Sequence, residues 1–340
     1  MKTTLIFSLS ILFSLSVFAQ PANWDAKKNF TILSYNVENL FDTIDIENKS
    51  DEEFTPQSAK MWNSERYYKK LNDLATVISS INAQELPEII GLVEIENIQV
   101  LNDLVLTEKL KPANYKVILD EGPDPRGIDC GLLYNPKEFK YVSHKTLAVR
   151  FPFAENKRTR DILYVKGKVK KETIHLFVNH WSSRRNGQEA SEPKRVESAK
   201  VLKHNVDSIL MLDPNASIIM MGDFNDEPSN KSIKETLDAG EINSNKTLVN
   251  LMYDLHNQKK GTFYYKGEYN MIDNLIVTKP LLLNTKGFRL LDKSGFIYNP
   301  DFICYTNKNG DKSPSKTYGG KNYYGGFSDH FPIYATFIVK

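Results

Sequence analysis

Asp223 and Asn225 are the first residues of this sequence whose types and spacing could do chemistry. They belong to Gly222-Asp223-Phe224-Asn225, which directly follows the short apolar run 217–221. That run predicts a buried strand, and alternation around Phe224 directs the two polar side chains into one cleft. Carboxylate and carboxamide oxygens at the C-terminal rim of a sheet suit Mg²⁺ or Mn²⁺. The alternative is an ordinary turn rich in Asp and Asn.

The same pattern, a functional side chain beside or within an apolar strand, recurs along the chain. Its further members are Asn36, Glu94, His180, Asp273, Asp329 and His330. Asp273 lies inside the apolar stretch 271–277, where an unpaired carboxylate is costly, so it needs a partner and His330 is the candidate. Each residue alone has a structural alternative, such as a turn cap or a hydrogen-bonded core histidine. Together they predict that carboxylates, amides and two histidines converge on one cleft.

Short apolar segments predict the strands that must position these residues. Besides 217–221, we expect strands at 30–37, 88–93, 115–119, 130–134, 140–149, 161–168, 172–179, 262–265, 271–277 and 331–339. Helical spacing predicts a helix over 67–81, a long amphipathic helix with Pro193 near its start, and a short helix from about Ser229. A long loop is expected at 300–326. Hairpin-like neighbours mixed with helical crossovers favour an α/β sandwich with mixed sheets.

Composition is that of an ordinary globular protein, with 41% hydrophobic and 25% charged residues. The formal net charge of +2 means that any electrostatic binding surface must be local. Residues 1–19 predict a removable signal peptide and export to the periplasm or beyond, with a membrane anchor as the alternative. One domain over 20–340, without a later membrane span, should follow. Cys130 and Cys304 could form a disulfide or remain free thiols.

The complete set of motifs resembles a known superfamily. The residues that carry the resemblance are, in chain order, Asn36, Glu94, His180, Gly222-Asp223-Phe224-Asn225, Asp273 and Ser328-Asp329-His330. This set is similar to the deoxyribonuclease I-like endonuclease/exonuclease/phosphatase superfamily. The connecting segments 126–134 and 179–184 are similar to its secreted bacterial nuclease-like branch. The resemblance implies a four-layer α/β/β/α sandwich in which two mixed sheets pack together and the cleft lies at one end.

The resemblance also implies a metal site. Glu94 would be the main metal-binding carboxylate, aided by Asn36 and Asp329. We prefer Glu94 to Glu96 because Glu94 directly follows the strand, as in the family's pattern. The ion would be Mg²⁺ or Mn²⁺, with Ca²⁺ as an alternative structural ion.

Catalytic roles follow from the same resemblance. Asp223 and Asn225 would bind metal or orient the attacking water. His330, held by Asp273, would act as a base or contact the phosphate, and His180 would donate to a phosphate oxygen or the leaving group. Imidazoles titrate near neutrality, and a carboxylate partner fixes their tautomer, so these assignments agree with phosphodiester hydrolysis.

Local clusters of basic and aromatic residues bear on the substrate. Local basic or tyrosine-rich segments occur at 157–160, 166–171, 184–185 and 318–327. Arg184 and Arg185 lie nearest the predicted cleft and could follow a phosphate backbone, and the tyrosines could stack on bases, but solvated surface loops are the alternative for both. Arg126 is a candidate phosphate contact and Asp129 a candidate support for His180.

These inferences predict an exported, metal-dependent phosphodiesterase that acts as an endonuclease on DNA, with RNA as a further substrate class. A lipid-head-group or small-molecule phosphodiesterase or phosphatase is the alternative hydrolase. A non-catalytic nucleic-acid- or protein-binding scaffold is the alternative of another class, and it would be expected to lack one of the site residues. No obligate protein partner is predicted.

Overall fold

The computed structural model describes residues 29–339, with the exception of 83–84, 186, 285–286 and 293–294. The predicted signal peptide, residues 1–19, lies outside the described residues and stays a prediction. Within the described part, no helix is both long and apolar enough to cross a membrane.

One large sheet contains the first and last strands of the described chain. Its strands are β1 (Asn29–Leu40), β2 (Ile89–Ile95), β3 (Lys116–Ile118), β4 (Asp129–Tyr134), β14 (Phe288–Leu290), β15 (Phe296–Ile297) and β20 (Ile333–Val339). They are ordered β14-β20-β1-β2-β4-β3, and β15 also pairs with β20. β1 and β2 run parallel, whereas the other pairs are antiparallel. The sheet is therefore mixed, as predicted.

A second large sheet contains most of the central part of the chain. Its strands are β5 (Lys140–Leu147), β6 (Ile162–Val169), β7 (Glu172–His180), β8 (Ser217–Asp223), β9 (Ala239–Gly240), β10 (Leu248–Asn250) and β13 (Asp273–Thr278). They are ordered β5-β6-β7-β8-β13-β10-β9. The β7–β8 and β9–β10 pairs are parallel, and the other pairs are antiparallel. This sheet is also mixed.

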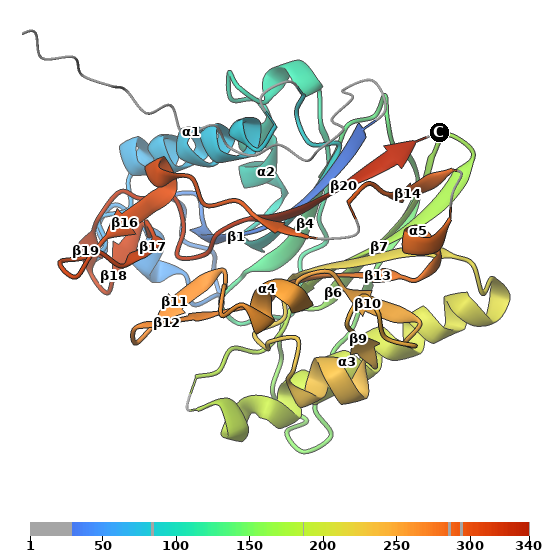
Figure 1. Cartoon of the computed structure of the whole chain (residues 1–340). Helices are drawn as coiled ribbons and strands as arrows, with labels where there is room; N and C mark the ends of the chain where they lie inside the picture. The colour runs from blue at the N-terminus through green and yellow to red at the C-terminus, as the bar shows by residue number, and fades with distance from the viewer. Residues whose placement is uncertain (1–28, 83–84, 186, 285–286, 293–294, 340) are drawn as a thin grey trace, which may run out of the picture.

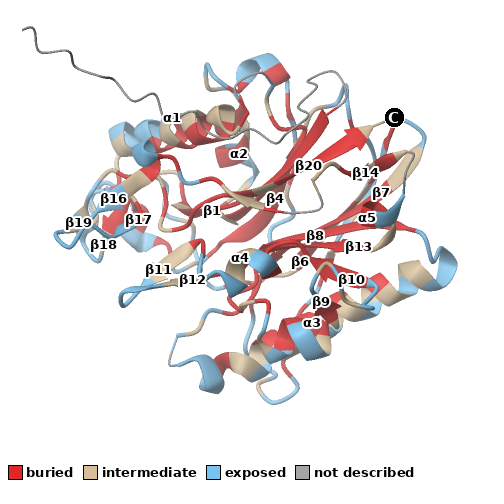
Figure 2. Cartoon of the chain, viewed as in Figure 1, coloured by how far each residue is buried: buried red, intermediate tan, exposed pale blue. Residues whose placement is uncertain are grey.

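Helices α1 (Ser64–Ser80) and α2 (Ile98–Val105) cover the outer face of the first sheet, and α3 (Gln188–Leu212) covers that of the second (Figure 1). The short helices α4 (Tyr253–Asn257) and α5 (Pro280–Leu283) instead pack against the apolar cluster between the sheets. One apolar cluster joins α1 and α2 to the first sheet, and another joins α3 to the second. A third cluster fills the space between the sheets, as the buried strands of Figure 2 show. The predicted four-layer α/β/β/α sandwich is confirmed.

The apolar spacing in the sequence explains these layers. In α1, Leu71, Leu74 and Ile78 recur every three or four residues and pack against the outer face of β1 and β2. In β8, Ile219 and Met221 face the first sheet, while Ile218 and Met220 face α3. A strand covered on both faces buries its side chains on both sides, and this explains the continuous apolar run 218–221 before Asp223.

The predicted loop over 300–326 is wrong in part, because this segment forms two short hairpins. They consist of β16 (Cys304–Thr306) with β17 (Lys312–Pro314), and β18 (Tyr318–Gly319) with β19 (Asn322–Tyr323). Gly310 and Gly320 adopt positive φ at the turns, so the glycines that indicated a loop instead close hairpins. Sequence reasoning also missed α2, and the expected helix near Ser229 is a single π-helical turn at Ser232–Thr236. Cys130 and Cys304 are free thiols.

The second sheet brings three predicted site residues to one rim. His180 ends β7 beside Asp223 at the end of the parallel strand β8. Antiparallel β13 begins at this rim, where Asp273 pairs with Asp223. On the first sheet, the segment before β20 is tied to β1, because the Ser328 hydroxyl donates to the Asn36 carbonyl at 2.7 Å. The two packed sheets therefore present their functional residues at the same end of the sandwich.

Gly222 allows the close approach of β7 and β8 at this rim. Its φ is +132°, and a Cβ there would lie 2.0 Å from the Asn179 carbonyl oxygen. We expect Gly222→Ala to destabilise the protein by about 2–4 kcal/mol in denaturant unfolding, because backbone cannot yield as a flexible side chain can. Gly267→Ala is the matched control, since Gly267 also has positive φ but no atom within 4 Å of the new Cβ. Equal losses from both variants would contradict the role of the close approach.

Candidate active site

Asp223 lies at the centre of the site and is buried. Its Oδ1 accepts from the Asn225 backbone N–H at 2.8 Å, and its Oδ2 accepts from the Asn36 and Asn225 side-chain amides at 3.1 and 3.2 Å. Asn225 takes a left-handed conformation with φ of 49°, which turns its amide back onto the carboxylate. Burial raises the pKa of the Asp223 carboxyl, and the neighbouring His330 opposes this shift. A further cation beside Asp223 would therefore stabilise its ionised form.

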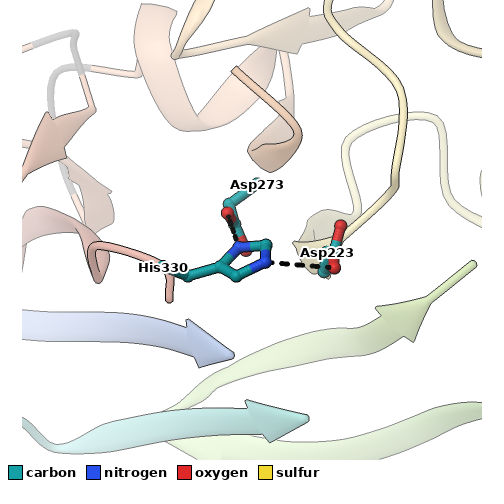
Figure 3. Close-up of side chains that lie close together, drawn as sticks. All are labelled: Asp223, Asp273 and His330. Atoms are coloured by element: carbon teal, nitrogen blue, oxygen red, sulfur yellow. Dashed lines mark hydrogen bonds and ion pairs between the residues drawn. The ribbon is translucent and has the colours of Figure 1, made fainter. Parts of the chain in front are cut away.

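His330 and Asp273 form a buried hydrogen-bonded pair beside Asp223 (Figure 3). His330 Nδ1 lies 2.7 Å from Asp273 Oδ2, and because a carboxylate only accepts, Nδ1 carries the proton. The Thr262 hydroxyl also donates to Asp273 Oδ2, at 2.5 Å. Burial alone would lower the pKa of His330, but the Asp273 charge and hydrogen bond hold it well above its ordinary value. The imidazole is thus fixed with Nε2 directed at Asp223 Oδ2, 3.9 Å away.

His180 faces the same space from the opposite side. Its Nε2 lies 3.7 Å from Glu94 Oε1 and 3.8 Å from Asp223 Oδ2. Burial, aided by the nearby Arg160 charge, lowers its pKa well below the ordinary histidine value. Within the described part of the chain, His180 Nδ1 has no hydrogen-bond partner. The pKa values of the two histidines are therefore shifted in opposite directions, which favours a cationic His330 and a neutral His180.

Glu94 owes its direction to a β-bulge. The register between β2 and β4 shifts between Val93 and Ile95, and Glu94 adopts φ of 67°. Such bulges re-aim a side chain next to an active site. The Asn39 backbone N–H donates to Glu94 Oε2 at 2.8 Å, while Oε1 faces His180. Glu96, in contrast, is buried and accepts from the Asp42 backbone N–H at 2.6 Å, which supports the choice of Glu94.

A cavity of about 760 Å³ opens over these groups and includes Glu94, His180, Asp223, Asn225, Asp329 and His330 in its walls. Around it, consecutive polar atoms stand 3.7–3.9 Å apart, from Glu94 through His180, Asp223 and His330 to Asp329. These separations are too long for hydrogen bonds. The groups face one another across a space that an ion and a substrate oxygen can fill.

The donors in this space fit a hard divalent cation. Glu94, Asp223 and Asp329 all offer carboxylate oxygens at the cavity wall, but both oxygens of Asp223 already accept hydrogen bonds from Asn36 or Asn225. Asp223, Asp273 and His330 also have potential ligand atoms within 4.8 Å of one another. Asp273 Oδ2, however, already accepts two hydrogen bonds, so this trio is better suited to proton transfer than to holding metal. Glu94 with Asp329 is the pair that would hold Mg²⁺ or Mn²⁺.

Asn36 is not among the residues that line the cavity, but it contacts Asp223, which is. Its Nδ2 donates to Asp223, and its Oδ1 accepts from the Glu38 backbone N–H at 3.0 Å. Both ends of the amide are therefore engaged within the protein, and Asn36 positions Asp223. Its predicted contribution to metal binding stays a prediction.

Arg126 and Arg184 were both predicted to contact the substrate phosphate, and the structure places their guanidinium groups in different surroundings. Arg126 lines the cavity and stays half-exposed, as a phosphate contact requires. Arg184 also lines it, but its guanidinium donates to the Asn225 carbonyl at 2.8 Å and to the side chains of Asn230 and Asn270. Arg184 therefore supports the Asp223–Asn225 turn, and burial lowers its pKa.

Asp129 is away from the cavity wall. It is buried, and its Oδ1 accepts from the Gly122 backbone N–H at 2.9 Å. Among the described residues it makes no hydrogen bond to His180, so the expected support of that imidazole is not seen. Its position at the start of β4 fixes the loop that contains Arg126 instead.

Several residues that shape the site were not identified as site residues from the sequence. Phe263 lies in a hairpin formed by β11 (Phe263–Tyr265) and β12 (Glu268–Asn270), and its ring centroid is 5.0 Å from that of His330. Asp226, next to the Asp223–Asn225 turn, forms a buried ion pair with Arg195 of α3 at 2.7 Å. Only the unusual density of charge in 223–227 could have indicated such a support; nothing in the sequence marks the aromatic partner of His330.

Metal binding should be visible as stabilisation. Since an ion would neutralise facing carboxylates, we expect Mg²⁺ or Mn²⁺ at about 100 times Kd to add about 2.7 kcal/mol to the free energy of unfolding. Differential scanning fluorimetry with and without chelator would show this as a rise in Tm of a few degrees. Glu94→Gln should abolish most of the rise. An equal rise in the wild type and in Glu94→Gln would place the ion elsewhere.

Comparison with known families defines the class of protein. The model of the endonuclease/exonuclease/phosphatase family matches residues 31–339. The chain therefore belongs to this family, whose members are phosphoric-ester hydrolases. No curated protein matches the chain significantly.

Several solved structures share the fold. Zebrafish (D. rerio) TDP2 in complex with single-strand DNA product is 16% identical, with a TM-score of 0.55 over 92% of this chain and 99% of that one. The human nocturnin catalytic domain with bound sulfate is 16% identical, with a TM-score of 0.54 over 92% and 95%. A Bacteroides thetaiotaomicron mannosyl-6-phosphatase is 17% identical, with a TM-score of 0.53 over 91% and 99%. At these identities the likeness establishes the fold and leaves the substrate open.

Proposed function

We propose that this protein is a divalent-metal-dependent phosphodiesterase that cleaves DNA. The observation that supports this best is the set of facing, unbonded groups of Glu94, His180, Asp223 and His330 in one cavity. The set combines a metal-binding carboxylate, one cationic and one neutral imidazole, and a buried carboxylate. A binding scaffold has no need for such an arrangement, because several of these groups lower stability unless a ligand compensates them.

Each group has a role in hydrolysis. A Mg²⁺ or Mn²⁺ ion held by Glu94 and Asp329 would neutralise charge that develops on a non-bridging phosphate oxygen. Asp223, positioned by the Asn36 and Asn225 amides, orients the attacking water and accepts its proton. His330 Nε2 donates to a phosphate oxygen, while Asp273 keeps the ring protonated and oriented. His180 Nε2 donates from the opposite side, toward a phosphate or leaving-group oxygen.

The walls of the cavity favour a nucleic-acid substrate. Phe263 and Tyr265 stack 6.3 Å apart on the β11–β12 hairpin, and both line the cavity. Tyr265 and the neighbouring Lys266 are exposed. An aromatic surface next to a phosphate site suits bases, which stack on side chains irrespective of sequence. The fold shared with TDP2, whose structure contains a single-strand DNA product, is consistent with this proposal.

A phosphomonoesterase acting on small molecules is the second candidate. It is supported by the shared fold of the mannosyl-6-phosphatase. The two candidates predict different substrates for the same metal and histidines, so activity assays separate them.

Degradation of supercoiled plasmid and single-stranded DNA, with Mg²⁺ or Mn²⁺ and with chelator, tests the proposal. We expect nicking and fragmentation that chelator abolishes and that Glu94→Gln reduces strongly. Release of inorganic phosphate from a sugar phosphate, without DNA cleavage, would favour the second candidate. Inactivity on every phosphate ester would contradict both.

A further inference from the structure

A second cavity adjoins the active-site cavity and is strongly basic. It has a volume of about 430 Å³, which is within the range of small-ligand sites. Ser183 and Arg185 line both cavities, so the two spaces are neighbours along the loop that follows His180. Apart from Arg160, whose charge helps to lower the pKa of His180, the residues that line the second cavity alone have no role in the proposed hydrolysis.

The charged side chains that line this second cavity are all cationic. Its cationic lining residues are Lys157, Arg158, Arg160, Arg185 and Lys194, and none of the described residues in its wall has a carboxylate. Arg160 is ion-paired, because its guanidinium lies 3.1 Å from Asp124. Within the described part of the chain, no carboxylate lies within 4 Å of the ammonium groups of Lys157 or Lys194. In a chain with a net charge of only +2, this local excess of positive charge is unusual.

Two separate elements hold the lysines. Lys157 ends a turn in which its backbone N–H donates to the Ala154 carbonyl at 2.8 Å. Lys194 belongs to α3, and its Nζ lies 6.0 Å from the ring centroid of the buried Phe151. Partial burial lowers the pKa of Lys194, and the Lys157 charge adds to this shift. The exposed Lys157 and the partly exposed Lys194 therefore lie near enough for their charges to repel, beside the ring of Phe151.

An anion in this cavity would relieve the repulsion. A nucleic-acid strand presents a second phosphate at a regular distance from the one being cleaved, whereas a small phosphate monoester presents none. Since the basic cavity shares a wall with the active site, a strand bound with one phosphate beside Glu94 and His330 can direct a neighbouring phosphate toward Lys157 and Lys194. Phosphate contacts of this kind set position and affinity without reading sequence.

We propose that the cavity between Lys157 and Lys194 binds a backbone phosphate of the DNA strand next to the phosphodiester that is cleaved. This inference rests on the proposed function and adds to it a second, non-catalytic phosphate site. The two lysines are positioning residues, which act on the affinity and register of the strand rather than on the chemical step.

The double variant Lys157→Gln/Lys194→Gln tests the proposal. Binding of a fluorescein-labelled single-stranded 12-nucleotide DNA, measured by anisotropy in chelator so that no cleavage occurs, should weaken by about tenfold. The slope of log Kd against log salt should decrease by about 1.4, since each lost contact to single-stranded DNA removes about 0.7. In cleavage assays of the same DNA with metal, KM should rise by a similar factor, while kcat changes much less.

Lys140→Gln/Lys168→Gln is the matched control, because it removes two exposed lysines from the opposite end of the second sheet. Its Kd and salt slope should equal those of the wild type. If both double variants change Kd and slope equally, the site proposal is overturned, even where the wild type cleaves DNA. If the wild type binds DNA through these lysines but cleaves none, the phosphate site stands and the proposed activity fails.

Discussion

His330→Ala is expected to lower kcat for phosphodiester cleavage by on the order of 10²–10⁴-fold. The variant removes the Nε2 that lies 3.9 Å from Asp223 Oδ2 and that donates to the phosphate in the proposed mechanism. It also leaves Asp273 with the Thr262 hydroxyl as its remaining side-chain partner. Steady-state kinetics on single-stranded DNA at saturating Mn²⁺ would measure the loss.

The pairing of His330 with Asp273 makes this prediction more specific. Because Asp273 acts through the imidazole, Asp273→Asn combined with His330→Ala should cost little more than His330→Ala alone. His175→Gln is a matched control, since His175 lies on the same strand as His180 but hydrogen-bonds to Tyr164 away from the cavity. Wild-type turnover from His330→Ala, with the fold intact by circular dichroism, would refute the assignment.

Asp223→Asn should lower kcat by a factor on the order of 10² or more while leaving the protein folded. The substitution keeps the size of the side chain but removes the charge that orients the water in the proposed mechanism. Burial raises the pKa of Asp223, so its contribution to stability is full at low pH and is lost as pH rises through the folded-state pKa. At pH 8 in chelator the buried charge is a cost, and the Tm of Asp223→Asn should equal or exceed that of the wild type.

Glu88→Gln provides the control for Asp223→Asn. Glu88 is also a buried carboxyl, and burial raises its pKa to about 8, but it lies just before β2 at the opposite end of that strand from Glu94. Its replacement should leave kcat within about twofold of the wild type. A large loss of activity from Glu88→Gln, or a large loss of Tm from Asp223→Asn, would mean that the kinetic effect reports on folding.

Much of the fold could be predicted because its strands are apolar and short. Residues 218–221 before Asp223 are all apolar because they lie between the other sheet and α3. Asp273 and His330 could be paired from sequence because a carboxylate within an apolar strand requires a partner, and the structure places them 2.7 Å apart. These inferences depend on the burial of side chains and on their alternation between the two faces of a strand, and both follow from the local pattern of apolar and polar residues.

The rest depended on long-range geometry that no local pattern records. Glu94 reaches the cavity through a β-bulge, whose positive φ at a glutamate has no sequence signal. Arg184 was expected to contact phosphate, but its donors are satisfied by Asn225, Asn230 and Asn270, from segments distant in sequence. The Tyr-rich segment 318–327 packs on α1, where the Arg66 guanidinium lies 4.1 Å from the Tyr323 ring centroid. In its place, Phe263 and Tyr265 supply the aromatic wall.

The position of a bound divalent ion tests the central claim most directly. Crystals of the protein soaked with Mn²⁺ should show an anomalous-scattering peak bonded to the Glu94 carboxylate, within the cavity that His180, Asp223 and His330 enclose. The peak should be absent from crystals of Glu94→Gln prepared in the same way. A Mn²⁺ peak on a different surface, in crystals of protein that cleaves DNA, would contradict the account.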